Sequence, residues 1–372
     1  MIKKSGVTSS MIKDYIKQEE MKKRKRKKII IRTILIIFLI LIILLGFWYT
    51  QLHTQLKKTA AKTYTPINRS TIPSNEPETL EEPFTVLVMG IEDYMDDVAR
   101  TDVLIFNVVN PKSKEIAMVT IPRDAYVYLE SRGLKDKINH AYVFGGLEDT
   151  LKTVYNLMEI PIDYYVSTNF NGFTDLVDAV DGVDVNIPFT FEAKMVDPSE
   201  WKTFEEGPAH LNGREALAYV RMRKTDPEGD FGRSKRQKEV IQAVVKKAVS
   251  LNGVTKINDI LRAIGDNVQT NISYDEYLSF VQLGKDLLHA NIDNIQLEGE
   301  GGYIGEIWYY FLNEENVEKV TTHLKEMMSH TDPSQATTFQ ERIEREEAEQ
   351  SKNPNMENIE TDNFSETKNN SN

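Results

Sequence analysis

One uncharged apolar run near the N-terminus constrains this chain more than any other feature. Residues 34–49, ILIIFLILIILLGFWY, contain no charged side chain. A membrane-spanning helix needs roughly 20 apolar residues. The run reaches this length if Ile29–Ile31 are added to it, because the long side chain of the intervening Arg32 can reach toward the lipid headgroups. Trp48 and Tyr49 are typical of a membrane interface. The sequence therefore predicts one transmembrane helix over residues 33–50.

The charge of the chain changes sign across this run. Residues 1–32 carry twelve Lys/Arg and three Asp/Glu, a net of +9, and because the whole chain has a net charge of −12 the remainder carries −21. Lys and Arg mark the cytoplasmic side of a span, so residues 1–32 are expected in the cytoplasm and the rest outside, as in a single-pass type II protein of the cell membrane. A cleaved signal peptide is the alternative, but its apolar core would be too long and no small-residue cleavage site follows.

The composition also limits the chemistry. The basic stretch at Lys22–Lys28 could be a nucleic-acid patch, but beside an apolar span it is better explained as the orientation signal, and no nucleic-acid partner is expected. The chain has no cysteine, which excludes disulfides, thiolate metal sites and thiol nucleophiles.

Three regions follow the apolar run. Residues 51–82 are polar and contain three prolines, with a fourth following at Pro83, which predicts an extracellular linker. Residues 83–330 are expected to form one globular domain. Residues 331–372 are acidic, rich in Asn and Glu and poor in aliphatic residues, which predicts a disordered tail with one short helix at Gln340–Gln350.

Apolar runs alternate with helical patterns inside the predicted domain. Short branched runs predict buried strands at Phe84–Glu92, Asp102–Asn110, Glu115–Pro122 and Ile162–Phe170. Helical spacing is found in between and afterwards, at Leu147–Ile160, Gly213–Arg221, Asp230–Ser250, Ile257–Asn267, Tyr274–His289 and Glu314–Met328. This order predicts an α/β fold with a central mixed β-sheet covered by helices on both faces, preceded by one transmembrane helix.

Arginines are concentrated around the start of the helix at Asp230–Ser250. At 100° per residue, Asp230, Arg233 and Gln237 share the face that continues as the apolar stripe, so these polar side chains point toward the interior. Arg221 and Arg223 precede them. Such groups either form a closed internal network or line a pocket for an anion. The plainer alternative is a solvated basic face with acidic counterions, namely Asp226, Glu228 and Asp230.

A second charged group flanks the predicted strands. Arg100 and Asp102 open one strand, Arg123 and Asp124 follow another, and Glu92 and Asp93 end the first. Several carboxylates near one strand end suit a hard cation such as Mg²⁺, with Mn²⁺ as a second possibility. Loop carboxylates that are simply solvated are the alternative. His140 is either a base or, more commonly for a lone histidine, a packed side chain.

Several sequence blocks together resemble the LytR-CpsA-Psr family. In order they are VLVMGIE, ARTDVLIFNVVNPKSKEIAMVTIPRDAYVYL, DKINHAYVFGG, IDYYVSTNFNGFTDLVDAVDGVDVNIP, GPAHLNGREALAYVRMR and GDFGRSKRQKEVI. The resemblance spans about residues 84–250 and extends to about residue 330. It implies an extracellular phosphotransferase that moves a glycopolymer, such as wall teichoic acid or capsule, from undecaprenyl pyrophosphate to N-acetylmuramic acid of peptidoglycan. The implied partners are this lipid-linked polymer, peptidoglycan and the membrane.

The resemblance also implies roles for individual residues. The pyrophosphate-binding residues of the family correspond to Arg100, Arg123, Arg221, Arg223, Arg233 and Gln237, and its catalytic residues to Asp102, Arg123 and Asp230. The resemblance implies that Asp102 is a metal ligand. The family commonly has Asp at the position of Glu92, so the second ligand in this chain is either Glu92 or the neighbouring Asp93. A hydrolase acting on the same pyrophosphate, and a non-catalytic regulator of cell-wall metabolism, are the alternative functions.

Overall fold

The structure is a computed structural model that describes residues 57–352, except 59–60, 76, 93–98, 198, 251–259 and 261–264, together with scattered residues between 38 and 54. The predicted cytoplasmic segment over 1–32 lies outside the described residues. So does most of the predicted transmembrane helix over 33–50. Among the residues that are described, no helix combines the length and apolar character that crossing a membrane requires. Residues 59–372 form a unit of their own.

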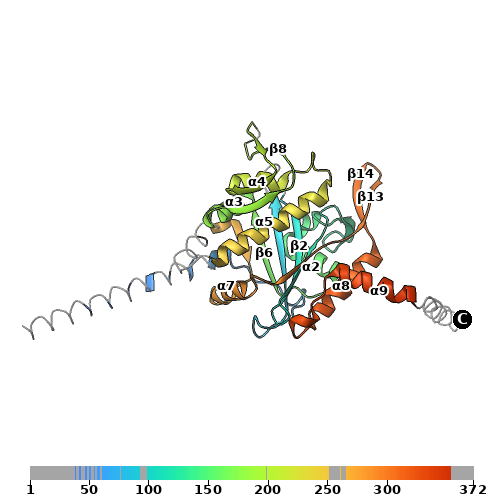
Figure 1. Ribbon diagram of the computed structural model, residues 1–372, viewed down its shortest axis with the longest axis horizontal. Coiled ribbons are helices and arrows are strands. Elements are labelled where there is room, and N and C mark those ends of the chain that lie inside the picture. Colours follow the sequence, from blue (N-terminus) through green and yellow to red (C-terminus); the bar gives the residue numbers. More distant parts are fainter. Residues whose placement is uncertain are drawn as a thin grey trace, which may run out of the picture. The chain divides into compact units, whose positions relative to one another are not determined.

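A mixed sheet occupies the centre of this unit (Figure 1). Six described strands form it in the order β11-β6-β1-β2-β3-β12. Their bounds are β1 (Phe84–Glu92), β2 (Arg100–Asn110), β3 (Glu115–Thr120), β6 (Tyr164–Asn169), β11 (Val268–Thr270) and β12 (Asn291–Gln296). β2 is antiparallel to β1 and β3, whereas β6 is parallel to β1 and β12 is parallel to β3. Four strands therefore end at one edge of the sheet, here called the site edge, where β2 begins.

The other described elements surround this sheet. Four two-stranded ribbons pair β4 (Tyr126–Leu129) with β5 (Leu134–Lys137), β7 (Val183–Ile187) with β10 (Gly207–Leu211), β8 (Phe191–Lys194) with β9 (Trp201–Phe204), and β13 (Gly299–Ile304) with β14 (Ile307–Leu312). The helices are α2 (His140–Met158), α3 (Phe170–Ala179), α4 (Gly213–Arg221), α5 (Asp230–Ser250), α7 (Tyr277–Asp286), α8 (Glu314–Met327) and α9 (Phe339–Lys352). Short 3₁₀ turns lie at Gly265–Asn267, Tyr274–Glu276 and Pro333–Gln335.

Side-chain alternation along the strands divides the core into two layers. On one face Leu87 and Met89 of β1 pack with residues of α2 and α8. On the opposite face Phe84 packs edge-on against Phe280 of α7, with ring centroids 5.9 Å apart. Because both faces bury apolar side chains under helices, the prediction of a mixed sheet covered on both faces is confirmed.

The folded unit begins earlier than the sequence suggested. Residues 51–82 were expected to be a linker, yet Ile67 and Ile72 are buried in the core. Arg69 donates from Nη1 to the Ile162 carbonyl at 2.6 Å, and the buried Asp163 carboxylate accepts from the backbone N–H of Asn75 at 2.6 Å. The polar composition concealed this packing because a few well-placed apolar residues are enough to anchor an irregular segment.

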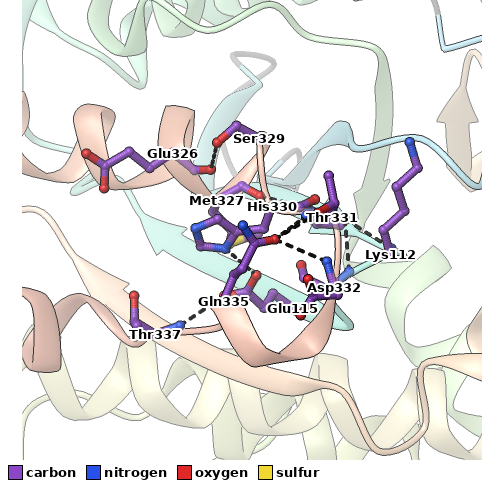
Figure 2. Close-up of polar contacts among 12 residues, drawn as sticks. Lys112, Glu115, Glu326, Met327, Ser329, His330, Thr331, Asp332, Gln335 and Thr337 are labelled. Atoms are coloured by element: carbon purple, nitrogen blue, oxygen red, sulfur yellow. Dashed lines mark hydrogen bonds and ion pairs between the residues drawn. The ribbon is translucent and has the colours of Figure 1, made fainter.

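The folded unit also extends beyond residue 330. Glu115, at the start of β3, is buried, and its Oε2 lies 2.7 Å from His330 Nδ1 (Figure 2). Its Oε1 accepts from the backbone N–H of Thr337 at 3.2 Å. The α9 helix contains the predicted Gln340–Gln350 helix, and Arg342 pairs with Glu326 of α8 at 3.4 Å. Residues 331–352 are therefore ordered against the domain, and the predicted tail from 353 onward lies outside the described residues.

Candidate active site

A β-bulge places Asp102 at the site edge. Gly90 of β1 pairs with Val103, but Ile91 pairs with Thr101, so Asp102 is the extra residue on β2. Bulges of this kind re-aim a side chain and are common beside active sites. Glu92 ends β1 and hydrogen-bonds to the Asp102 side chain. Burial and then the neighbouring Asp102 carboxylate raise the pKa of Glu92, so this pair of acids favours a shared proton or a bound cation.

Arg123 connects this pair of acids to the end of β3. Its Nη1 donates to Asp102 Oδ1 at 2.8 Å, and its Nε lies 3.6 Å from Asp124 Oδ2. Burial disfavours the charge, but Asp102 and further acids outweigh it and raise the pKa of Arg123, which stays a cation. The buried Nε has no hydrogen-bond partner among the described residues. Arg123 therefore keeps one N–H donor available.

The helices α4 and α5 bring three more arginines to the same edge. A capping box between Asn212 and Glu215 fixes the start of α4, which ends at Arg221. Arg221 Nη2 lies 3.7 Å from Glu92 Oε1, and its guanidinium lies 4.6 Å from the ring centroid of Phe170. Its side chain is 45% exposed, so the contact with Glu92 is weak and the guanidinium is accessible to a ligand.

Asp230 gathers the other two arginines at the start of α5. Its Oδ1 lies 2.9 Å from Arg233 Nη2 and 3.3 Å from Arg223 Nε. Arg233 is largely buried, and this burial lowers its pKa although the Asp230 carboxylate partly compensates. The buried Nε of Arg233 has no hydrogen-bond partner in the part of the chain that is described. Arg233 is thus buried, as its predicted inward orientation requires, whereas the Asp230 side chain remains 33% exposed.

Two buried guanidinium nitrogens, the Nε atoms of Arg123 and Arg233, have no hydrogen-bond acceptor among the described residues, which favours the anion pocket over the alternatives left open by the sequence. A closed network would satisfy them, and a solvated basic face would not bury them. An anion with several oxygens would complete the network, because guanidinium groups bind phosphate oxygens through paired N–H donors. The start of α5 adds the positive end of its helix dipole. The geometry therefore favours a site for a multiply charged anion.

Other predicted residues occupy less central positions. Arg100 is exposed at the start of β2 opposite Glu92, and it forms no ion pair with another described residue. Gln237 is half-buried on α5 and makes no hydrogen bond within the described ranges. Asp93 falls in the stretch 93–98, outside the described residues. His140 is 27% exposed and its Nδ1 lies 3.0 Å from Asp136 Oδ2, a packed position.

Arg236 belongs to a separate buried network. Its guanidinium pairs with Asp226, and its Nε donates to the Tyr219 carbonyl at 3.0 Å. The side chains are 3% and 2% exposed. The predicted counterions are thus only partly correct, since Asp226 neutralises this internal arginine and Glu228 pairs with the exposed Lys235. Arg233 and Arg236 are both arginines, one turn apart on the same helix. The sequence therefore gives no signal that one lies at the site edge and the other in a buried ion pair.

The pair formed by Glu92 and Asp102 is the part of the site that suits a divalent cation. No group of three or more potential ligands gathers among the residues described. Mg²⁺ does not require one, because it commonly takes one or two carboxylates together with substrate phosphates and water. Burial, and then the neighbouring Asp102 carboxylate, raise the pKa of Glu92, and a bound cation would offset the charge of both acids. The residues present therefore fit a cation that binds together with a phosphate-containing substrate.

The fold is that of a mixed-sheet α/β protein, and its arginines gather at one edge of the sheet. A model of the LytR_cpsA_psr family matches residues 49–326, and the chain belongs to that family. A curated relative is the polyisoprenyl-teichoic acid–peptidoglycan teichoic acid transferase TagU of Bacillus licheniformis, which is 40% identical over 248 residues, 67% of this chain and 79% of the relative.

Solved structures agree with this assignment. The crystal structure of B. subtilis TagV is 39% identical with a TM-score of 0.59, covering 68% of this chain and 99% of that one. A structure of TagT bound to LIIa-WTA is 30% identical with a TM-score of 0.58, covering 72% of this chain and all of that one. The resemblance deduced from the sequence blocks is thereby confirmed.

Proposed function

We propose that this chain is a phosphotransferase that attaches a lipid-linked anionic glycopolymer, such as wall teichoic acid, to peptidoglycan. The TagU relative is named for the transfer of teichoic acid from a polyisoprenyl carrier to peptidoglycan. The observation that carries the proposal is the cluster of Arg123, Arg221, Arg223 and Arg233 at the site edge, where the buried Nε atoms of Arg123 and Arg233 find no acceptor in the described part of the chain. A pyrophosphate group, with several oxygens and more than one negative charge, matches these donors.

The residues of the site suggest how the reaction proceeds. Arg123, Arg221, Arg223 and Arg233 bind the pyrophosphate oxygens, and Asp230 holds two of these guanidiniums in place. A sugar hydroxyl of peptidoglycan attacks the polymer-side phosphorus, and the bond from that phosphorus to the bridging oxygen breaks. The leaving group is the polyprenyl monophosphate, whose developing charge the arginines stabilise. The hydroxyl proton passes to a carboxylate, and Asp102 and Asp230 are the two that we assign to this step.

The same proposal includes a divalent cation held by Glu92 and Asp102. When bound, Mg²⁺ or Mn²⁺ would offset charge on the pyrophosphate. We expect weak Mn²⁺ binding to the protein alone and at least tenfold tighter binding when inorganic pyrophosphate is present, because the phosphate oxygens complete the ligand set. Asp102→Ala should abolish this gain. Calorimetric titrations of Mn²⁺ with and without pyrophosphate measure it.

Substitutions at Glu92 discriminate between the two candidate second ligands. Glu92→Asp should keep most of the pyrophosphate-dependent Mn²⁺ affinity, and Glu92→Ala should lose much of it. Asp93→Ala is the matched comparison, because the sequence leaves either Glu92 or Asp93 as the second ligand. Normal titrations for Glu92→Ala together with a defect in Asp93→Ala would show that Asp93 is the ligand instead.

We further propose that the domain lies outside the cell membrane. The argument is the +9 charge of residues 1–32 before the apolar run, which predicts a cytoplasmic N-terminus. Protease added to intact protoplasts should degrade the domain over residues 84–352 and spare a tag placed before Met1. Protection of the domain with loss of the tag would reverse the orientation and remove access to the wall.

The products of a defined reaction test the proposed function against its alternatives. Purified protein would be given a lipid-pyrophosphate glycan and peptidoglycan oligomers, and the products would be analysed by mass spectrometry. A transferase yields muropeptide joined to the polymer through a phosphodiester, whereas a hydrolase yields free polymer phosphate. The absence of both products, with the lipid substrate recovered intact, would favour a non-catalytic regulator.

A further inference from the structure

An aromatic stripe runs along one face of the β13–β14 hairpin. Directly paired residues of an antiparallel ribbon lie on the same side, and Tyr303 pairs with Trp308 while Gly301 pairs with Tyr310. Tyr303, Trp308 and Tyr310 therefore share a face and form the stripe. Tyr303 is 72% exposed, and the rings of Trp308 and Tyr310 have centroids 6.4 Å apart.

Gly301 allows this stripe to lie close to the backbone. A Cβ atom at Gly301 would approach the Trp308 ring to 2.8 Å, closer than a real contact permits. The indole therefore rests across the glycine instead of standing beside a side chain. The arrangement presents a low, broad aromatic surface, and not a set of separate exposed rings.

The base of the opposite face anchors the hairpin to the domain, whereas Ile304 and Ile307 near the turn of that face are exposed. Tyr126 of β4 packs against Tyr309 and Phe311, with ring centroids 4.9 and 5.5 Å apart. The Tyr310 backbone N–H donates to the carbonyl of Asp124 at 2.9 Å, and Ala125 forms a β-bridge with Tyr310. Because Asp124 follows Arg123 directly, the base of the stripe lies beside the arginine cluster.

The topology places the hairpin on the same side of the sheet as the site. β12 is parallel to β3, so both strands end at the site edge, and β13 begins three residues after β12 ends. Figure 1 shows the hairpin projecting from the domain beyond the end of the sheet. The stripe therefore extends outward from the arginine cluster.

We propose that the aromatic stripe binds the acceptor, as a subsite for an uncharged glycan chain of β-1,4-linked amino sugars. This inference rests on the proposed function, since a polymer transferase must hold a second, extended substrate beside the pyrophosphate. Sugar rings present apolar C–H faces, which pack on flat aromatic surfaces, while their hydroxyl groups remain hydrated. Tyr310 at the base of the stripe would place the sugar nearest to Arg123.

Charge on the hairpin argues against the other extended partners. Residues 299–312 contain Glu300 and Glu306 and neither Lys nor Arg. A polyanionic donor polymer would be repelled by these glutamates. A membrane-binding tip typically carries Lys or Arg for anionic headgroups, whereas here Glu306 sits at the exposed turn. An uncharged glycan meets neither obstacle.

Tryptophan fluorescence of the full chain tests the subsite directly. The chain has three tryptophans, so Trp48→Phe and Trp201→Phe together leave Trp308 as the only emitter. Titration with a β-1,4-linked N-acetylglucosamine hexamer should change the Trp308 emission to saturation. Adding Tyr303→Ala should weaken the hexamer affinity by about two- to tenfold, the size of one aromatic contact. Tyr128→Ala, at a tyrosine on β4 that is 47% exposed and lies away from the stripe, should leave the affinity unchanged.

The outcomes separate this inference from the proposed function. No emission change with the hexamer, or equal losses in both tyrosine variants, would overturn the glycan subsite. Emission changes with anionic phospholipid vesicles, but not with the hexamer, would overturn it in favour of a membrane contact. In the transfer reaction Tyr303→Ala should raise KM for the acceptor and leave KM for the lipid donor unchanged. Hexamer binding without any transfer would remove the proposed function and leave the subsite standing.

Discussion

Replacing Arg123 with alanine should slow polymer transfer by about 10²- to 10³-fold, the effect of losing one preorganised charge at a reacting centre. Arg123 contacts Asp102 at 2.8 Å and retains a buried N–H donor. Its removal takes away a pyrophosphate contact and leaves Asp102, which lies beside Glu92, without the guanidinium that pairs with it. The rate of formation of polymer-linked muropeptide measures the loss.

Two comparison variants make this result interpretable. Lys235→Ala removes a cation from the same region, but Lys235 is 66% exposed and pairs with Glu228 at 2.7 Å, so transfer should stay near the wild-type rate. Arg123→Lys keeps the charge but loses the paired donors, and its rate should remain well below that of the wild type. Equal rates for Arg123→Ala and Lys235→Ala would mean that Arg123 lies outside the reacting centre.

Replacing Arg236 with alanine should lower the free energy of unfolding by about 3–5 kcal/mol, the cost of leaving one partner of a buried ion pair without its counterion. Asp226 is only 2% exposed, and the Arg236 guanidinium also donates to the carbonyls of Tyr219 and Met222. Urea unfolding followed by circular dichroism measures the change. The effect is on stability, in contrast to the effect expected for Arg123.

A double variant tests whether the unpaired charge causes that loss. Arg236→Met combined with Asp226→Leu removes both charges and keeps apolar volume, so it should recover part of the stability lost in Arg236→Ala. The alternative result is that the double variant loses as much free energy of unfolding as the two single variants added together. That result would mean that lost packing and backbone hydrogen bonds, and not the unpaired charge, cause the instability.

Periodicity and capping predicted the regular elements near the site well. The bounds of β1, α4 and α5 match those expected from the sequence, because each has a clear apolar period and a defined start. The helix expected from Leu147 instead begins at His140, with a break at Gly146, whose φ is 62°. The region 257–267 predicted as helical lies largely outside the described residues.

The parts that escaped prediction depend on contacts distant in sequence. The bulge at Asp102 arises from the register between β1 and β2, which no local pattern specifies. Arg233 and Arg236 look alike in sequence: Arg233 pairs with Asp230 within one turn of α5, whereas the pair of Arg236 with Asp226 depends on how the loop before α5 folds. The β13–β14 hairpin was not predicted because glycines interrupt the strand pattern of β13. One of them, Gly301, leaves the space in which the Trp308 ring of the aromatic stripe lies.

Binding of a lipid pyrophosphate tests the central claim most directly. Calorimetry would compare a short-chain polyprenyl pyrophosphate with the corresponding monophosphate, using the wild type, Arg233→Ala and Lys235→Ala. The arginine cluster predicts tighter binding of the pyrophosphate, an affinity loss of about 10- to 100-fold in Arg233→Ala, the size of one charge-assisted hydrogen bond, and no loss in Lys235→Ala. Equal affinities for the two lipids, or equal losses in the two variants, would contradict the assignment of this cluster as a pyrophosphate site.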